Sequence, residues 1–393
     1  MSDNAPVYLD NHATTRLDPD VFESMIPWFT DSYGNAGSGT HVMGTVARDA
    51  VESARRRVAD AVGATAREIV FTSGATESVN LAIAGVVSRQ PSGQCVVPVT
   101  EHVAVLDVVD QLEREGLSVC RVPVAAKDTE TPGALDLNLL DEMIGAGTSL
   151  VSVMFANNEI GTVHPISAIA DIVHSHGALL HVDCAQAIGN CSIDVTTSGA
   201  DLASFSAHKC HGPKGVGALY VRRQQRIVRI NPQVFGGGQE RGLRSGTLNV
   251  PGIVGMGHAC ELASKRLDES IEQMTTLRAK LWDLLVDTIP GIQLNGPLLD
   301  RGVRLPNNLN VLIPGIDGST LLAELSRTGV AASAGSACSS EQPRPSHVLL
   351  ALGLSEEEVR QSIRFGLSRM TTSQEIQSAS ERLQAAIQSL GSA

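Results

Sequence analysis

The sequence predicts an α/β protein with a mostly parallel central sheet and a second, smaller domain. Short apolar runs typical of strands alternate with helical patterns from about residue 50 to residue 260. Crossover helices between successive strands are the connection that parallel strands require. The chain has 393 residues, more than one domain usually contains. A long helical pattern from residue 252 to about residue 289 ends at Pro290-Gly291 and predicts the link to the second domain.

The first strand of this sheet is expected at residues 68–72, running into a helix that starts near Thr76. Further strands are expected at residues 94–99, 150–156, 178–182 and 202–206. Polar residues follow the ends of four of these strands, namely His102, Asn158, Asp183 and Lys209. Ligands bind at the carboxyl ends of strands in such sheets, so we expect these side chains to share a site.

The smaller domain is expected to be of the α+β type. It contains a strand near residues 308–313, a helix from about residue 319 to residue 327, and two closing helices. We therefore assign residues 15–260 to the large domain, and residues 1–14 and 261–393 to the small domain.

Composition narrows the class of protein. Hydrophobic residues make up 42% of the chain and aromatic residues only 3%, so the core must be built from small and aliphatic side chains. The net charge is −12 and no basic tract occurs, which argues against nucleic-acid binding. No signal-peptide pattern and no apolar stretch of membrane-spanning length is evident. We expect a cytoplasmic protein without a membrane partner.

The seven cysteines are odd in number, scattered, and never spaced as Cys-x-x-Cys. Neither a disulfide framework nor a metal site is therefore expected. Cys338 lies in a stretch of small residues, which predicts an exposed and reactive thiol. The other six lie in apolar or strand-like contexts and are expected to be buried and inert, although Cys184 and Cys210 adjoin the proposed site.

One short window carries the residue types of a pyridoxal phosphate site. Asp183 and Gln186 follow one strand, and Ser206-Ala207-His208-Lys209 follows the next. A lysine amine can form a Schiff base with the cofactor aldehyde, and a carboxylate can keep the pyridine nitrogen protonated. The order of these groups after two strands predicts this cofactor, whereas a lone His-Lys pair would predict nothing.

Three further segments are candidates for binding. Residues 72–78 join a strand to a helix through small residues, so free N–H groups could hold a phosphate, although an ordinary helix cap is the alternative. The loop at residues 236–247 is rich in Gly and Arg and could hold an anion or line a subunit boundary. Arg364 lies between apolar residues and implies a carboxylate partner, either a substrate or an internal acid.

With these residues in view, the chain resembles the cysteine desulfurases, specifically the NifS/IscS-like branch of the fold-type I, or aminotransferase class V, pyridoxal phosphate enzymes. The resemblance covers nearly the whole chain. It rests on ordered motifs at residues 8–15, 71–78, 157–161, 206–209, 244–247 and 335–338.

The resemblance implies a role for each motif residue. Lys209 would carry the cofactor, His102 would stack on its ring, Asp183 would pair with the ring nitrogen, and Gln186 would bond the phenolic oxygen. The remaining residues would bind phosphate or substrate. The phosphate would be held by Ala75, Thr76, Ser206 and His208, with Thr247 reaching in from the second subunit of a homodimer, and the amino acid by Asn158 and Arg364.

The implied reaction removes sulfur from L-cysteine. Lys209 would move the Cα proton, the Cys338 thiolate would attack the substrate sulfur, and alanine and a protein-bound persulfide would result. His102 would accept a proton from the thiol. An iron–sulfur scaffold or a tRNA-thiolation enzyme would then take the sulfur. Selenocysteine lyase or another amino-acid transferase is the alternative enzyme, and a non-catalytic cofactor- or partner-binding module is the alternative from another class.

Overall fold

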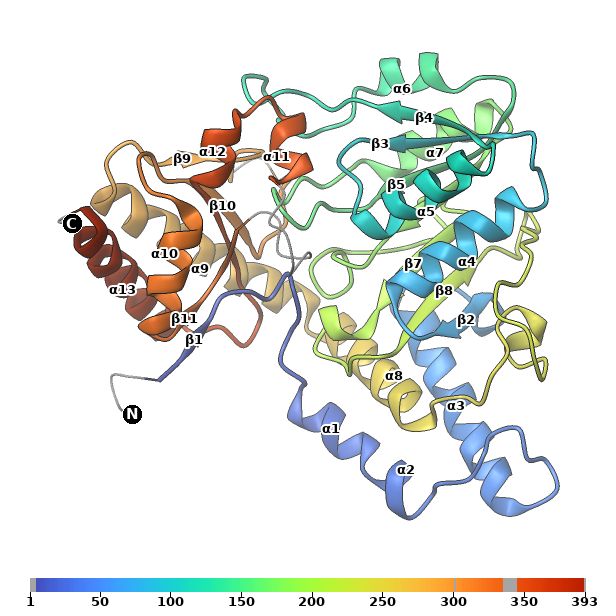
Figure 1. Cartoon of the computed structure of the whole chain (residues 1–393). Helices are drawn as coiled ribbons and strands as arrows, with labels where there is room; N and C mark the ends of the chain where they lie inside the picture. The colour runs from blue at the N-terminus through green and yellow to red at the C-terminus, as the bar shows by residue number, and fades with distance from the viewer. Residues whose placement is uncertain (1–4, 300–301, 335–344, 392–393) are drawn as a thin grey trace.

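The computed structural model describes residues 5–299, 302–334 and 345–391. A seven-stranded sheet has the order β2-β8-β7-β6-β5-β3-β4, with helices on both sides (Figure 1). Strands β7, β6, β5, β3 and β4 pair in parallel, while β8 runs antiparallel to both β2 and β7. The expected α/β class with a mostly parallel sheet is confirmed.

The strands of this sheet are short and almost wholly buried. Their bounds are β2 Ile69–Thr72, β3 Gln94–Pro98, β4 Ser118–Val122, β5 Thr148–Met154, β6 Leu179–Asp183, β7 Leu202–Ser206 and β8 Gly217–Val221. The helices between residues 19 and 209 are α1 Pro19–Met25, α2 Pro27–Thr30, α3 Val42–Ala61, η1 Ala66–Glu68, α4 Ala75–Val87, α5 Val103–Arg114, α6 Leu137–Met143, α7 Ile166–Ser175 and η2 Ala207–Lys209.

The carboxyl-terminal part forms a second layered unit, seen beside the large sheet in Figure 1. Its strands make a four-stranded sheet of order β12-β13-β10-β9. The amino-terminal strand β1 joins this unit by pairing in parallel with β11. The strand bounds are β1 Val7–Tyr8, β9 Gln293–Leu294, β10 Asn308–Leu312, β11 Val330–Ala331, β12 Ser333–Ala334 and β13 Ser362–Gly366. The helices from residue 240 onward are η3 Glu240–Gly242, α8 Val250–Lys265, α9 Leu267–Thr288, α10 Gly318–Arg327, α11 His347–Ala351, α12 Glu356–Arg360 and α13 Ser373–Gly391.

Several elements differ from the sequence expectations. The pattern read as one helix from residue 252 to residue 289 is two helices, because the backbone leaves the helical region at Arg266 (φ −106°, ψ 11°). Three helices, not two, close the described chain, since α11 and α12 are single short turns before α13. Strands β4, β8 and β13 were not expected. The domain boundaries stay a prediction, and the proposed boundary at residue 260 falls inside α8.

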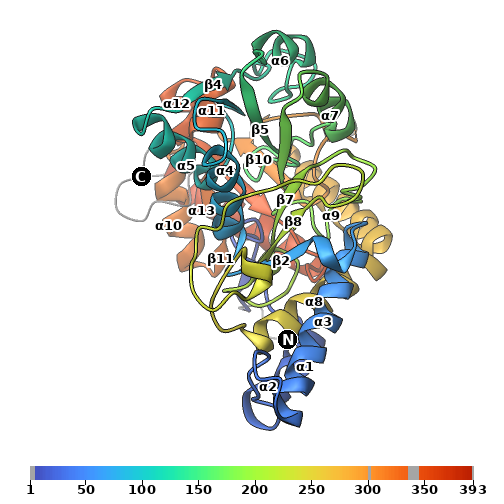
Figure 2. The same cartoon turned by 90° about the vertical axis from the view of Figure 1, so that its right-hand side faces the viewer.

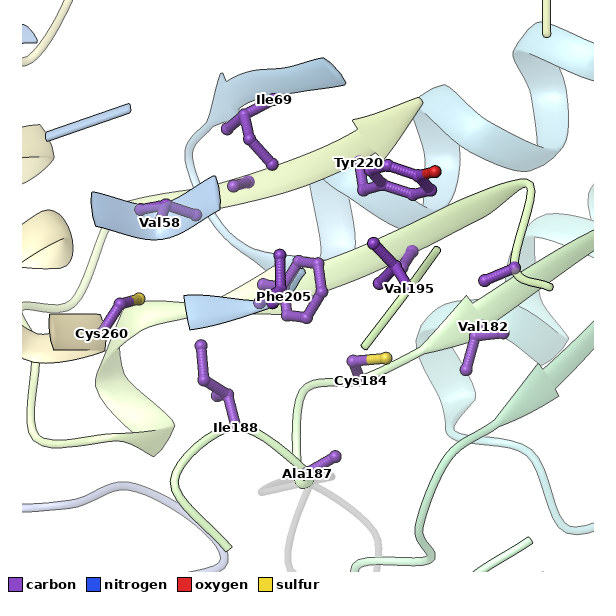
Figure 3. Close-up of a cluster of buried hydrophobic side chains, with 14 of the residues drawn as sticks. Val58, Ile69, Val182, Cys184, Ala187, Ile188, Val195, Phe205, Tyr220 and Cys260 are labelled. Atoms are coloured by element: carbon purple, nitrogen blue, oxygen red, sulfur yellow. The ribbon is translucent and has the colours of Figure 1, made fainter. Parts of the chain in front are cut away.

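One large core lies between the seven-stranded sheet and helices α3, α7 and α8. Figure 3 shows Phe205 and Tyr220, from neighbouring strands, among aliphatic side chains that include Ile69 and Ile188. Small residues let the elements approach closely: a Cβ added at Gly257 of α8 would lie 2.7 Å from the Cα atom of Ala54 in α3. This close helix packing explains how a chain with few aromatic residues fills its core.

The first helices project from this body. Helices α1 and α2, with the start of α3, extend away from the sheet in both views (Figures 1 and 2). Their exposed side chains include Phe22, Phe29, Tyr33 and Val42. None of the described helices is long and apolar enough to cross a membrane.

Candidate active site

A cavity of about 480 Å³ lies where several strands of the large sheet end. It collects most of the side chains that the sequence singles out. Nine of them line it, namely Ala75, Thr76, His102, Asn158, Asp183, Gln186, Ser206, His208 and Lys209. The expectation that polar residues after separate strands would meet at one edge of the sheet therefore agrees with the structure.

The amino terminus of α4 forms one wall of the cavity. Gly74 precedes the helix and offers no side chain to cap it, so the first N–H groups of the helix receive no side-chain cap bond. Ser73, Gly74, Ala75 and Thr76 all line the cavity. Together with the helix dipole, free N–H groups make such a terminus suited to a phosphate.

Lys209 and Asp183 come from the ends of two neighbouring strands. The Lys209 Nζ atom donates hydrogen bonds to the main-chain oxygens of His12 and Ala13, the second at 2.9 Å. Asp183 ends β6 and accepts a hydrogen bond of 2.9 Å from the Ala185 N–H. Burial raises the pKa of this carboxyl group. A cationic nitrogen in the cavity would supply the partner that a buried carboxylate needs to stay ionised.

His102 caps the amino terminus of α5. Its Nδ1 atom accepts a hydrogen bond of 3.1 Å from the Ala104 N–H, so a neutral His102 carries its proton on Nε2. Burial lowers the pKa of this imidazole, which keeps the ring neutral near pH 7. A neutral imidazole beside the cavity can stack on a flat ring, and its Nε2 N–H can donate a hydrogen bond.

Arg364 is only 2% exposed and does not itself line the cavity. Its guanidinium donates to Asp10 at 3.0 Å and to the Asn158 main-chain oxygen at 3.2 Å. Its Nε atom has no hydrogen-bond partner within the described ranges. The internal carboxylate that the sequence left as an alternative is thus present, and the side chain still touches a residue that lines the cavity.

Besides Arg364, one more expected site residue, Thr247, does not line the cavity, and Cys338 cannot be placed. Thr247 is exposed and lies outside the cavity lining. Cys338 lies outside the described residues. Of the other six cysteines, four are buried and two are half-buried. Burial raises the pKa of the Cys95 and Cys191 thiols to about 12, and burial also raises the pKa of the Cys184 thiol well above its usual range.

The sequence reasoning counted residues 8–15 among the family motifs but assigned none of them to the cavity, and it missed one buried acid. Ala13 and Thr14 line the cavity, and His12 contacts both Lys209 and Gln186. The mostly polar run Asp10-Asn11-His12-Ala13-Thr14 shortly after β1 is the signal that could have indicated them. Glu101 is fully buried next to His102 and accepts a hydrogen bond of 2.6 Å from the Met154 N–H.

Comparisons with known proteins agree with this geometry. The aminotransferase class-V family model matches residues 7–378. The cysteine desulfurase IscS of Anaeromyxobacter dehalogenans is 48% identical over 94% of this chain and 90% of its own length. A probable mitochondrial cysteine desulfurase of Dictyostelium discoideum is 44% identical over 98% of this chain and 84% of its own length.

Solved structures give the same result. A NifS-like protein superposes with a TM-score of 0.89 at 40% identity, covering 98% of this chain and 100% of the other. The structure of SspA in complex with cysteine superposes with a TM-score of 0.80 at 34% identity, covering 93% of this chain and 100% of the other.

The fold and the cavity thus define an enzyme of the α/β class with its site at the strand ends. The chain belongs to the aminotransferase class-V family and, within that family, to the cysteine desulfurases of the IscS and NifS kind.

Proposed function

We propose that this cysteine desulfurase uses pyridoxal phosphate to convert L-cysteine to alanine and leaves the sulfur as a persulfide on Cys338. The observation that carries the proposal is that Lys209, Asp183 and the uncapped start of α4 face one cavity. Lys209 would attach the cofactor, Asp183 would pair with its ring nitrogen, and the start of α4 would bind its phosphate. The cysteine desulfurase relatives support the choice of substrate.

The residues present fit the cofactor. Asp183 needs a cationic partner in the cavity to stay ionised, and a protonated pyridine nitrogen is such a partner. Ala75, Thr76, Ser206 and His208 would hold the phosphate at the start of α4, because all four line the cavity there. When bound, the cofactor supplies an electron sink that acidifies the Cα–H bond of an attached amino acid.

The chain's own residues would handle the protons. The Lys209 amine lies at the cavity wall on two carbonyl oxygens, from which it can swing to take the Cα proton of the substrate at Nζ. His102 would hold its neutral ring against the cofactor. Because Nδ1 already accepts the Ala104 N–H and Nε2 carries the proton, the ring would donate a hydrogen bond to the Cys338 thiolate and would not take up its proton.

Asn158 and Arg364 would orient the substrate. A guanidinium binds a carboxylate through two parallel hydrogen bonds, and Arg364 keeps an unpartnered Nε within the described residues. Its contact with Asn158 places the charge next to the cavity. The substrate carboxylate would therefore bind beside Asp10, which already holds one end of the guanidinium.

Cys338 would act as the nucleophile. Its thiolate attacks the substrate sulfur, a new S–S bond forms, and the substrate C–S bond breaks with its electron pair left on the alanine product. The buried thiols whose pKa is raised, such as Cys95 and Cys184, are poor nucleophiles at neutral pH. They are therefore unsuited to the role that we assign to Cys338.

We also propose a homodimer in which Thr247 serves the phosphate site of the partner subunit. Thr247 is exposed on a loop whose neighbour Phe235 is 80% exposed, as expected for a surface that a second copy covers. An iron–sulfur scaffold or a thiolation enzyme would accept the sulfur, in line with the IscS names of the relatives. A cytoplasmic location stays a proposal, and one relative is mitochondrial by name.

Cofactor attachment tests the proposal directly. We expect the purified protein to bind pyridoxal phosphate with the visible absorbance of a lysine-bound form, and borohydride to fix the cofactor to the peptide that contains Lys209. A Lys209→Ala variant should remain folded by circular dichroism and lose that absorbance. Lys214, which also lines the cavity, provides the matched control as Lys214→Ala. Covalent fixation that persists in Lys209→Ala would show that another lysine carries the cofactor.

A further inference from the structure

We propose that His12 is a positioning residue that fixes the side-chain amide of Gln186, so that an N–H group and not an oxygen is presented to the cavity. Only the identity of the acceptor that this N–H meets rests on the proposed function. The orientation itself follows from a chain of hydrogen bonds that joins the two sheets of the molecule.

The orientation of Gln186 is set by its two contacts with His12. The Gln186 Nε2 atom lies 3.0 Å from the main-chain oxygen of His12, and its Oε1 atom lies 3.0 Å from the His12 Nδ1 atom. A carbonyl oxygen can only accept, so the amide nitrogen must face it and donate. The amide oxygen then faces the imidazole, and His12 must carry a proton on Nδ1 to donate to it.

The other imidazole nitrogen is fixed independently by Asn308. The Oδ1 atom of Asn308 accepts a hydrogen bond of 2.8 Å from Arg304, which is a donor only. The Nδ2 atom donates to the main-chain oxygen of Glu159 at 3.0 Å and lies 3.2 Å from the His12 Nε2 atom. Since the amide orientation of Asn308 is fixed at both ends, Nε2 of His12 must accept.

A single protonation state therefore satisfies both neighbours. The main-chain oxygen of Asn307 also interacts with the imidazole. A proton on Nε2 directed there would face an N–H group of Asn308, donor against donor. It would also leave Nδ1 of His12 without a proton, so that its lone pair would face the Oε1 atom of Gln186. His12 is 1% exposed, and burial lowers its pKa to about 3, so the ring stays neutral and does not become a double donor.

The hydrogen bonds already made by the Gln186 amide determine which of its atoms is left for the cavity. The Oε1 atom of Gln186 is occupied by His12, and one of its two amide hydrogens is occupied by the His12 carbonyl. The second hydrogen belongs to a side chain that lines the cavity, so it is free to bind an oxygen there. If pyridoxal phosphate is bound, that acceptor would be its anionic phenolic oxygen, which an amide oxygen in the flipped orientation would repel.

The chain of bonds also connects distant parts of the fold. Asn308 begins β10 of the four-stranded sheet, His12 follows β1, and Gln186 follows β6 of the seven-stranded sheet (Figure 1). The carbonyl of His12 additionally accepts a hydrogen bond from Lys209. His12 thus positions Gln186 and Lys209 at the cavity while it is itself held by Asn308 of the four-stranded sheet.

The test compares two substitutions of His12, one that can still donate a hydrogen bond to Gln186 and one that cannot. His12→Asn can place an amide N–H near the position of Nδ1, whereas His12→Phe keeps a flat ring and removes both hydrogen bonds. A hydrogen bond donated to the phenolic oxygen withdraws negative charge from it. The protonated nitrogen that would join Lys209 to the cofactor then loses a stabilising neighbour, and its pKa is lowered. We expect His12→Phe to raise the pH midpoint of the lysine-bound cofactor absorbance by about half to one unit, the size of one hydrogen bond.

Controls and cofactor-free measurements make the test decisive. His12→Asn should return most of the way to the wild-type midpoint, and His176→Phe, on the far end of α7, should leave it unchanged. A folded His12→Phe variant with the wild-type midpoint would overturn the inference. If that variant does not fold, or if the wild type binds no cofactor, nitrogen NMR of histidine-labelled wild type without cofactor decides. A proton on Nδ1 of His12 supports the inference, and a proton on Nε2 overturns it.

These outcomes are separable from the reaction. A wild type that releases no alanine from L-cysteine, yet shows the shifted midpoint in His12→Phe and its rescue in His12→Asn, would refute the desulfurase proposal and leave the role of His12 intact. An active wild type with His12 protonated on Nε2 would do the reverse.

Discussion

Arg364 is held between an internal carboxylate and the cavity. It donates to Asp10 and to the Asn158 main-chain oxygen, and it is buried in β13. A buried guanidinium with one carboxylate beside it can bind a second carboxylate through its remaining N–H groups. Under the proposed function, binding of the substrate carboxylate would depend on this one guanidinium, which Asp10 holds in place.

We expect Arg364→Lys to raise the KM for L-cysteine by about 10- to 100-fold, with a smaller change in kcat. A lysine lacks the paired donors, and a charge-assisted hydrogen bond contributes about 1.5–3 kcal/mol, or about one to two factors of ten. Steady-state alanine formation measures both constants. Arg360→Lys, on the exposed helix α12, is the matched control. An unchanged KM in Arg364→Lys would place the substrate carboxylate elsewhere.

The place of a residue at the cavity was predictable from the sequence where it depends on the strand that the residue follows. Lys209 and Asp183 follow the ends of neighbouring strands, and parallel strands bring their carboxyl ends together. The role of His12 was not predictable, because it depends on contacts with Gln186 and Asn308, which are 174 and 296 residues away. Such long-range hydrogen bonds leave no periodic pattern in the sequence.

Among the elements, the loop at residues 236–247 is held in an unusual backbone conformation. Glu240 and Arg241 both have positive φ angles, 48° and 58°, which side-chain-bearing residues rarely adopt. The Glu240 carboxylate pairs with Arg55 of α3 at 2.6 Å and accepts the Phe71 N–H at 2.8 Å. Arg55 also lies over the ring of Phe71, 4.7 Å from its centroid. This buried ion pair anchors the loop that carries Thr247.

We expect Glu240→Leu to lower the free energy of unfolding by about 3–5 kcal/mol, because it removes the buried carboxylate partner of Arg55 and leaves that charge only the more exposed Glu52. Urea denaturation measures the loss, and sedimentation at several concentrations shows whether the loop and the dimer weaken with it. The double variant Arg55→Met with Glu240→Leu should recover part of the stability. Glu324→Ala removes an exposed ion pair as a control and should cost about 1 kcal/mol or less. An equally small loss in Glu240→Leu would contradict the anchoring role.

The elements themselves were predictable in part. Strands β5, β6 and β7 were expected within two residues of their observed ends, since each is an apolar run between turn signals. Strand β8, Gly217–Val221, was missed although it is a short apolar run buried on both faces, as β5 and β7 are. Strand β13 was missed because a buried arginine interrupts its apolar pattern.

In the whole molecule, several histidines are buried and neutral. His164 is fully buried, its two ring nitrogens have no hydrogen-bond partner within the described ranges, and burial lowers its pKa to about 4. His181 is bonded to Ser152 and Ser204, and burial lowers its pKa to about 3. The unfolded chain binds protons on these groups near pH 6.5, while the folded chain does not.

We expect the free energy of unfolding to fall as the pH drops below about 6.5, and His164→Leu to reduce that fall. The folded pKa of His164 is depressed, so its contribution is full above the unfolded value of about 6.5 and is lost as the pH falls toward 4. One histidine accounts for about 1.4 kcal/mol per pH unit in this window. Buried acids such as Glu159, whose burial raises its pKa to about 7, oppose this trend.

Urea denaturation at pH 7 and pH 5 checks this prediction by comparing the two slopes. The difference between pH 7 and pH 5 should be smaller in His164→Leu than in the wild type. Equal pH dependence in the two proteins would mean that His164 titrates alike in the folded and unfolded states. His176→Leu, a more exposed histidine paired with Asp141, serves as the control.

Formation of alanine and sulfide from L-cysteine with a thiol reductant tests the central claim most directly, in wild type, Lys209→Ala and Cys338→Ser. The account predicts both products from the wild type, no alanine from Lys209→Ala, and loss of both products in Cys338→Ser even though that variant retains the lysine-bound cofactor absorbance. Full alanine and sulfide release by Cys338→Ser would contradict the assigned nucleophile. The absence of alanine from a cofactor-loaded wild type would contradict the reaction itself.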